Sequence, residues 1–194
     1  MSILISLCKT WKLKIKVWIV LLCAATFALT ACNCYSAEST EGWVIDADTK
    51  KSIEGVIVVA NWQLHKSITG GKRPADHLNI METTTDNDGL FYFEGWGQKT
   101  ALWGFFIDRD PELLFYKKKG YEYRSLENTQ RTEIDTSKVR QSAWNGKKIE
   151  LKRFDGHLRE YASHLSSLYT LVRSIFHGDK CEWKRTPKLV LAIA

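Results

Sequence analysis

The alternation of side chains between residues 56 and 64 restricts the fold of this chain more than any other feature. Val56, Val58, Ala60, Trp62 and Leu64 fall on one face of an extended strand. The other face begins with β-branched residues and continues with amides. A stretch with a period of two and this share of β-branched residues forms a strand. The sequence therefore predicts a fold built mainly from β-strands.

Further short runs of the same kind recur along the chain, separated by residues that form turns. The segment Asp86–Gly89 contains the Asn, Asp and Gly residues that tolerate the backbone angles of a tight turn, so we expect a strand–turn–strand hairpin around it. About seven strands of this length predict an antiparallel β-sandwich over residues 41–154. Besides 56–64, we expect strands at 43–46, 82–85, 90–93, 113–116, 121–123 and 147–152.

Two segments of the body resemble a known family. Residues 42–60 and the Thr-Asp-x-x-Gly-x-Phe pattern within 84–93 are similar to the carboxypeptidase regulatory-like domain. The resemblance implies a transthyretin-like sandwich of seven strands and a module without catalytic activity. The chain departs from the family at Lys50, where a turn glycine is usual, and at Ile53 and Glu54, where Leu-Ala is frequent.

The N-terminal segment predicts export and a lipid anchor. A basic stretch precedes 13 apolar residues at 17–29, a length typical of a signal peptide and short for a membrane span. The next residues, Leu29-Thr30-Ala31-Cys32, resemble the bacterial lipoprotein box. That resemblance implies that residues 1–31 are removed and that Cys32 is acylated, which anchors the protein in a membrane. An uncleaved signal anchor, or cleavage after Ala37, remain alternatives.

The residue after the anchor bears on the location. Residue 33 is Asn, whereas in lipoproteins of this kind an Asp there tends to hold the protein at the inner membrane. We therefore expect a periplasm-facing lipoprotein, with the outer membrane favoured. Residues 32–40 are expected to form a short tether.

The cysteines agree with an oxidising compartment. Cys8 and Cys23 lie in the signal segment and Cys32 is the expected acylation site, which leaves Cys34 and Cys181. We expect a disulfide between these two, with two free thiols as the alternative.

The C-terminal part, 155–194, changes period. Apolar residues recur at spacings of three and four within 155–177, which predicts an amphipathic helix followed by a short apolar tail at 187–194. We expect this stripe to pack against the sandwich or the tail, and a partner-binding helix is the alternative. The stripe consists of Leu158, Tyr161, Leu165, Leu168, Val172 and Ile175.

Motifs for catalysis or metal binding do not emerge from the sequence. The spacing in Asp86–Gly89 differs from that of a calcium loop and suits a turn. His157 and His164 lie seven apart, without an evident third ligand. No serine-hydrolase elbow or zinc-protease motif occurs. We expect no catalytic residue, no metal site and no cofactor.

Aromatic residues are concentrated in the glycine-rich segment 94–111. Trp96, Trp103 and Phe105 are candidate ligand contacts, because aromatic faces stack on sugars and contact peptides. In the alternative interpretation, Trp103, Phe105 and Ile107 form one face of a core strand. Trp96 is the residue most expected at a surface.

The charge argues against nucleic-acid binding. The net charge is +6, but residues 1–31 contain four lysines and no acid, so the remainder has a charge of only +2. The sequence therefore predicts a non-catalytic envelope lipoprotein that binds an envelope protein or a glycan, or has a structural role. The alternatives are a hydrolase that acts on envelope material, and a subunit of an envelope complex that uses the C-terminal helix.

Overall fold

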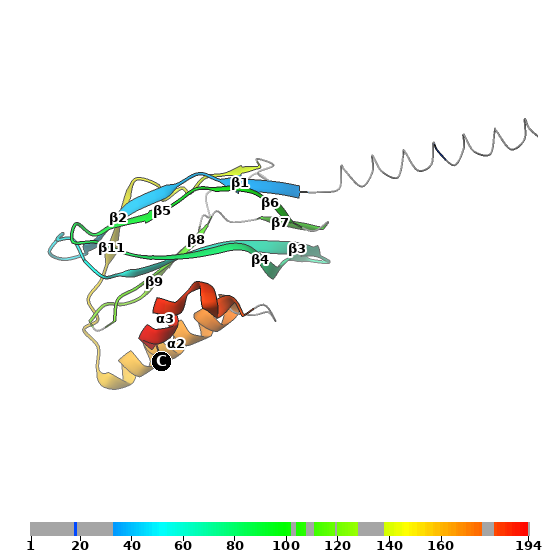
Figure 1. The fold of residues 1–194 in the computed structure, drawn as a ribbon. Helices are drawn as coiled ribbons and strands as arrows, with labels where there is room; N and C mark the ends of the chain where they lie inside the picture. Colours follow the sequence, from blue (N-terminus) through cyan, green and yellow to red (C-terminus); the bar gives the residue numbers. More distant parts are fainter. Residues whose placement is uncertain are drawn as a thin grey trace, which may run out of the picture.

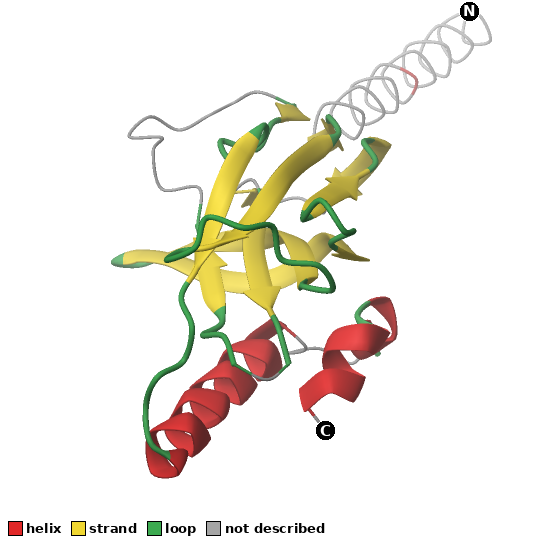
Figure 2. Ribbon diagram, turned by 90° about the vertical axis from the view of Figure 1, so that its left-hand side faces the viewer, coloured by secondary structure: helices red, strands yellow, loops and turns green. Residues whose placement is uncertain are grey.

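The structure is a computed structural model that describes residue 18 and residues 33–101, 104–107, 111–118, 120–127, 138–175 and 181–193. Strands form two packed layers, and helices form a third layer on one outer face (Figures 1 and 2). The expected mainly β fold with a C-terminal helix is therefore confirmed. None of the helices in the described ranges has the length and apolarity needed to cross a membrane.

The upper layer in Figure 1 contains two three-stranded sheets that lie end to end, and the chain passes from one to the other several times. Strands β1 and β2 are separated by only two residues, as are β5 and β6. The first sheet has the order β10 (Val139–Arg140), β1 (Asn33–Ala37), β6 (Trp96–Ala101), and the second the order β11 (Lys147–Leu151), β2 (Thr40–Asp46), β5 (Leu90–Phe93).

The lower layer is a five-stranded sheet. Its longest pair, β3 and β4, is antiparallel and forms a hairpin that extends beyond the rest of the sheet. The strand order is β4 (Gly71–Thr84), β3 (Ile57–Ile68), β8 (Glu112–Tyr116), β9 (Arg124–Leu126), and β7 (Phe105–Ile107) pairs with the far part of β3.

The alternation of β3 explains both faces of this sheet. Val58, Ala60 and Trp62 point between the two layers and belong to the main core. Ile57 and Val59 point to the opposite side, where they pack in a second cluster with the helices. Apolar residues occur on both faces of the strand because both faces are covered.

The helical layer consists of α2 (Leu158–Ile175), the short 3-10 helix η1 (Glu182–Arg185) and α3 (Pro187–Ile193). The middle of the predicted apolar stripe is used within the chain, since Leu168 and Val172 are buried against the lower sheet. Leu158, at the start of the stripe, is 85% exposed. Leu189 of α3 completes this cluster.

Two expectations about the pairing of the strands were wrong. The sandwich is not wholly antiparallel, because β1 with β10 and β2 with β11 are parallel pairs. The turn Asp86–Gly89 does not close a hairpin: β4 pairs with β3, and β5 pairs with β2 in the other layer. The turn instead leads the chain from one layer to the other, with Gly89 at a φ of 74°.

The segment 32–40 differs from the expected tether. Residues 33–37 form β1, which lies between β6 and β10 in the upper layer, and β2 begins at Thr40. Tyr35 and Ala37 alternate inward and are buried. The first described strand of the sandwich therefore begins at Asn33. Cys32 itself lies outside the described residues.

Candidate functional site

Two pockets lie at opposite ends of the sandwich. The first has a volume of about 430 Å³. Its wall is formed by the residue after β2, by the residues that lead into β9, and by the end of β11. The second has a volume of about 240 Å³ and lies between β6 of the upper layer and the β3, β4 and β7 strands of the lower layer.

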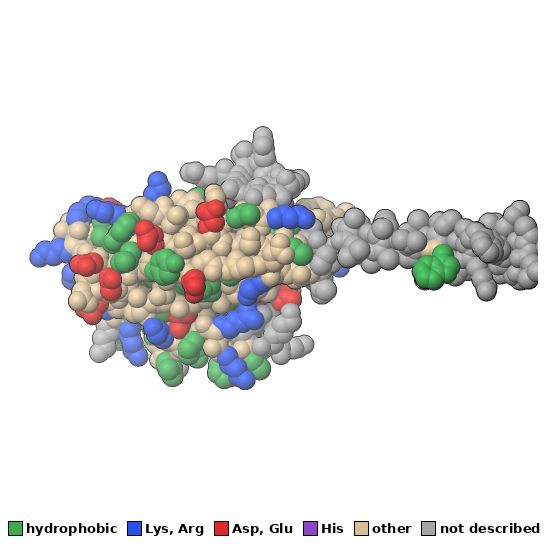
Figure 3. Space-filling model, turned by 45° about the horizontal axis from the view of Figure 1, so that its top comes forward, with side chains coloured by type: hydrophobic (Ala, Val, Ile, Leu, Met, Phe, Trp, Pro, Cys, Tyr) green, Lys and Arg blue, Asp and Glu red, His purple; other side chains and the backbone are tan. Residues whose placement is uncertain are grey.

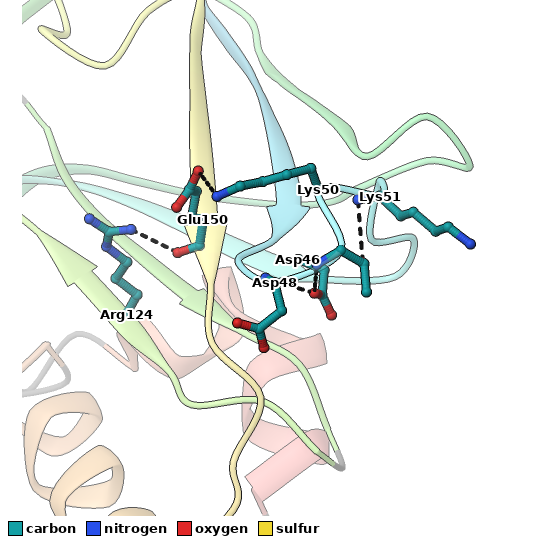
Figure 4. A network of polar contacts seen from close by, with 7 residues as sticks. Asp46, Asp48, Lys50, Lys51, Arg124 and Glu150 are labelled. Carbon is teal, nitrogen blue, oxygen red and sulfur yellow. Dashed lines mark hydrogen bonds and ion pairs between the residues drawn. The ribbon is translucent and has the colours of Figure 1, made fainter.

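The larger pocket adjoins a network of polar contacts that closes the turn after β2 (Figure 4). At the centre is the carboxylate of Asp46, which is 2% exposed. Its Oδ1 accepts hydrogen bonds from the backbone N–H of Asp48 at 3.1 Å and of Thr49 at 2.8 Å. Its Oδ2 accepts from the hydroxyl of Tyr121 and from Nε of Arg153, both at 2.8 Å.

These contacts fix the protonation state of Asp46. The Thr49 backbone N–H, followed by the Arg153 guanidinium and the Tyr121 hydroxyl, holds the pKa of the carboxyl far below its usual range. A carboxylate with four donors and a low pKa is a poor general base. The group therefore stabilises the turn. Lys50 of the same turn forms an ion pair at 2.6 Å with Glu150, which lies on the pocket wall.

A prediction follows for the stability of the protein in acid. Because the pKa of Asp46 is lower in the folded state, its contribution to the free energy of unfolding is complete above the unfolded pKa of about 3.9 and is lost as the pH falls below it. Asp46→Asn should lower the urea midpoint at pH 7 and flatten its decline between pH 5 and 2. Urea titrations followed by tryptophan fluorescence measure both effects.

The exposed Asp48 supplies the control, because it hydrogen-bonds to Asp46 through its backbone N–H and not through its side chain. Asp48→Asn should leave the midpoint and its pH profile nearly unchanged. Equal effects of the two substitutions would contradict the assignment of the acid sensitivity to Asp46.

The smaller pocket contains one of the sequence-predicted ligand contacts. Phe105 of β7 forms part of its wall, together with Leu64, Asp76, His77, Leu78, Lys99 and Thr100. Nζ of Lys99 donates to Oδ1 of Asn79 at 2.8 Å and lies 5.7 Å from the ring centre of Trp96. Burial, and then the positive charge of Arg185, lowers the pKa of Lys99. An aromatic ring, an ammonium group and a carboxylate thus meet in one cleft.

The other two candidates differ in position. Trp96 was expected at a surface, but it is half-buried and packs edge-on against Trp62, with ring centres 5.4 Å apart. Trp96 is not part of the pocket wall, but it packs against the apolar cluster that contains the wall residue Leu64. Trp103 lies outside the described residues. Sequence reasoning missed Lys99 and Asp76, and no spacing in the sequence indicates that β4 and β6 bring them together.

The described cysteines and histidines do not gather into a metal site. Cys34 and Cys181 are both free thiols in the structure, so the expected disulfide is not present. The sulfur of Cys34 lies 3.7 Å from the hydroxyl of Thr100 in the upper layer, whereas Cys181 precedes η1 in the helical layer. Nε2 of His164 accepts a hydrogen bond from the backbone of Tyr123 at 3.0 Å. Within the described ranges, no three His, Cys, Asp or Glu residues cluster as metal ligands.

Comparisons with known proteins give limited similarity. No family model and no curated protein matches the chain. Among solved structures, a streptococcal ancillary pilin has 14% identity and a TM-score of 0.29 over 61% of this chain and 30% of the pilin chain. The 3-chlorocatechol 1,2-dioxygenase from Rhodococcus opacus 1CP has 12% identity and a TM-score of 0.34 over 63% of this chain and 61% of that chain.

A third structure, the 9R-lipoxygenase from Cyanothece PCC8801, has 13% identity and a TM-score of 0.29 over 65% of this chain and 18% of that chain. The chain thus spans less than two thirds of the length of each of these proteins. Overlaps of this quality assign neither a family nor an activity.

Proposed function

We propose that this chain is a non-catalytic lipoprotein of a bacterial envelope, a binding or structural module held at the periplasmic side of a membrane by acylated Cys32. The main support is the position of the lipoprotein-box residues 29–32, which end one residue before the first strand of the fold. A signal cut before Cys32 would leave every described strand and helix of the module intact. Asn33 favours the outer membrane.

The proposed sandwich is of the transthyretin-like type, as in carboxypeptidase regulatory-like domains. If β1 with β2, β5 with β6 and β10 with β11 each count as one bent strand, the upper layer has three strands opposite β3, β4, β8 and β9. Lys50 gives further support. It stands where that family usually has a turn glycine, and its φ of 57° is one that glycine adopts most easily.

The non-catalytic part of the proposal rests on how the titratable side chains are used. Asp46 accepts four hydrogen bonds, and His164 accepts one from a backbone N–H. Lys99 donates to an amide oxygen. Each of these groups is engaged in holding elements of the fold together, and a catalytic acid or base would have to leave such contacts.

The binding part of the proposal is the cleft beside Phe105 and Lys99. Its volume of about 240 Å³ lies below the range of about 300–1,000 Å³ of most ligand pockets, so it suits only one sugar ring or one side chain. The ring of Phe105 would stack on the ligand, and Lys99 and Asp76 would hydrogen-bond to it. A glycan or a peptide of the envelope has this chemistry.

The anchor is tested by metabolic labelling with radioactive palmitate in a bacterial host. The native chain should incorporate the label, and Cys32→Ala should abolish incorporation, because the thiol is the acceptor of the diacylglyceryl group. Cys34→Ala is the matched control and should label like the native chain. Intact mass should also show the loss of residues 1–31 and the addition of acyl groups. Unchanged labelling of Cys32→Ala would overturn the proposal.

A further inference from the structure

The proposed anchor, Cys32, is the residue directly before the first described strand, so no linker separates the two. Asn33 is already paired with Ala101 of β6, and consecutive Cα atoms are 3.8 Å apart. An acylated Cys32 would therefore hold this end of the sandwich against the bilayer surface. Whatever side chains lie at that end must face lipid headgroups.

The β3–β4 hairpin lies at this same end (Figure 1). The start of β1 and the far part of β3 share one apolar cluster, which contains Tyr35, Leu64, Ala101 and Ile107. Beyond this cluster, Lys66 pairs with Phe105 of β7, and the hairpin continues to its turn at Thr69 and Gly70. We call the exposed residues 66–73 the hairpin tip.

The hairpin tip has the chemistry of a surface that binds anionic lipids. Lys66, Lys72 and Arg73 are exposed, and the sequence contains no acidic residue between 65 and 75. Nζ of Lys66 lies 5.9 Å from the ring centre of Phe105, and Nζ of Lys72 lies 5.7 Å from that of Phe106. Ile68, between these cations, is 50% exposed. Clustered cations interleaved with apolar side chains suit the headgroup region of a bilayer.

The opposite end of the sandwich differs. Its turns contain both signs of charge, with exposed Asp86 and Asp88 in one and Lys50 and Lys51 in another, and Lys50 is paired with Glu150. Space-filling Figure 3 shows this mixture of acidic and basic side chains across one face, with basic side chains also on the part nearest the N-terminal trace. The hairpin tip is therefore suited to a negative surface, and the opposite end is not.

We propose that the hairpin tip docks on the anionic phospholipid headgroups of the membrane that holds the anchor. This proposal rests on the lipid anchor proposed above, and it adds a second contact that fixes the orientation of the sandwich. The cleft beside Phe105 then lies close to the bilayer, and the turn at Asp86–Gly89 points away from it.

The test uses the full acylated chain in vesicles that contain a nitroxide-labelled headgroup as a fluorescence quencher. Cys34→Ser and Cys181→Ser remove the free thiols, and a fluorophore is placed at Ile68→Cys in the tip or at Asp88→Cys at the opposite end. In vesicles with 30% phosphatidylglycerol, we expect strong quenching at position 68 and little at position 88. In vesicles of phosphatidylcholine alone, quenching at position 68 should fall, although the anchor still keeps this end of the sandwich nearer to the bilayer than position 88.

Charge reversal tests the mechanism. Replacing Lys66, Lys72 and Arg73 by Glu should lower the ratio of docked to undocked chains by more than about a hundredfold, since the loss of each cation near an anionic surface costs about fivefold and each new carboxylate adds repulsion. Reversing Lys51, Lys118 and Lys148 instead changes the net charge equally, away from the tip, and should preserve quenching. In 1 M salt, where the Debye length is about 3 Å, the native tip should also be released.

The outcomes separate the two proposals. A chain that lacks acyl groups and does not incorporate into vesicles overturns the anchor, and docking with it. A chain that incorporates but shows equal quenching at 68 and 88 overturns docking alone. Quenching at 68 that stays undiminished in phosphatidylcholine, in 1 M salt or after reversal of the tip charges also overturns docking.

Discussion

Trp62→Ala should lower the free energy of unfolding by about 3–5 kcal/mol, the largest effect that we expect from one core substitution. Trp62 is 1% exposed and lies between the two strand layers. Its removal leaves a cavity and deprives Trp96 of the ring against which it packs at an interplanar angle of 89°. Urea unfolding followed by far-ultraviolet circular dichroism measures the change.

Trp183→Ala is the matched control for this prediction. Trp183 belongs to η1, and its side chain is half-exposed. Removing an indole from such a position should change the free energy of unfolding by no more than about 0.5 kcal/mol. If both substitutions had the same effect, Trp62 would not be part of a tightly packed core.

Leu168→Ala should cost about 2–5 kcal/mol of folding free energy. The side chain has 0% exposure and fills the space between α2 and the lower sheet, where it packs in one cluster with Ile57, Val59 and Leu114. Leu158→Ala, in the same apolar stripe, should change the free energy of unfolding by less than about 0.5 kcal/mol because Leu158 is exposed. Chemical denaturation of the two variants compares them directly.

The comparison of Leu168→Ala with Leu158→Ala also tests whether α2 packs within the chain or binds another protein. If α2 binds mainly to another protein, Leu168→Ala would leave the isolated chain as stable as Leu158→Ala does. A large difference between them means that the helix is part of the sandwich.

Local patterns predicted β2, β3, β5, β8 and β11, but they placed a strand at 121–123 where the structure has β9 at Arg124–Leu126. They predicted the partners of the strands poorly. The alternation over 56–64 identified β3 and its two faces, because side-chain direction depends only on neighbouring residues. The residues of the turn Asp86–Gly89 were also recognised. Which strand β5 pairs with depends on β2, more than 40 residues earlier, and no local signal specifies it.

The first strand was missed for a different reason. Asn33–Ala37 is short, has few apolar residues and follows the expected acylation site, so it was interpreted as a tether. The alternation of Tyr35 and Ala37 was the available signal. The smaller pocket shows the same limit: the aromatic segment pointed to Phe105, but Lys99 and Asp76 join it only through the packing of two layers.

The pairing of β1 has a consequence for the order in which the chain assembles. This strand is the first described strand to be synthesised, yet Ser36 and Ala37 pair with Val139 and Arg140, about a hundred residues later. Contacts of such long separation in sequence slow folding, because the loop must close before the contacts form. The first strand therefore stays without β6 until residue 101 has emerged, and without β10 until residue 140 has emerged. During that interval its exposed backbone is a site for aggregation, against which a chaperone would protect the nascent protein.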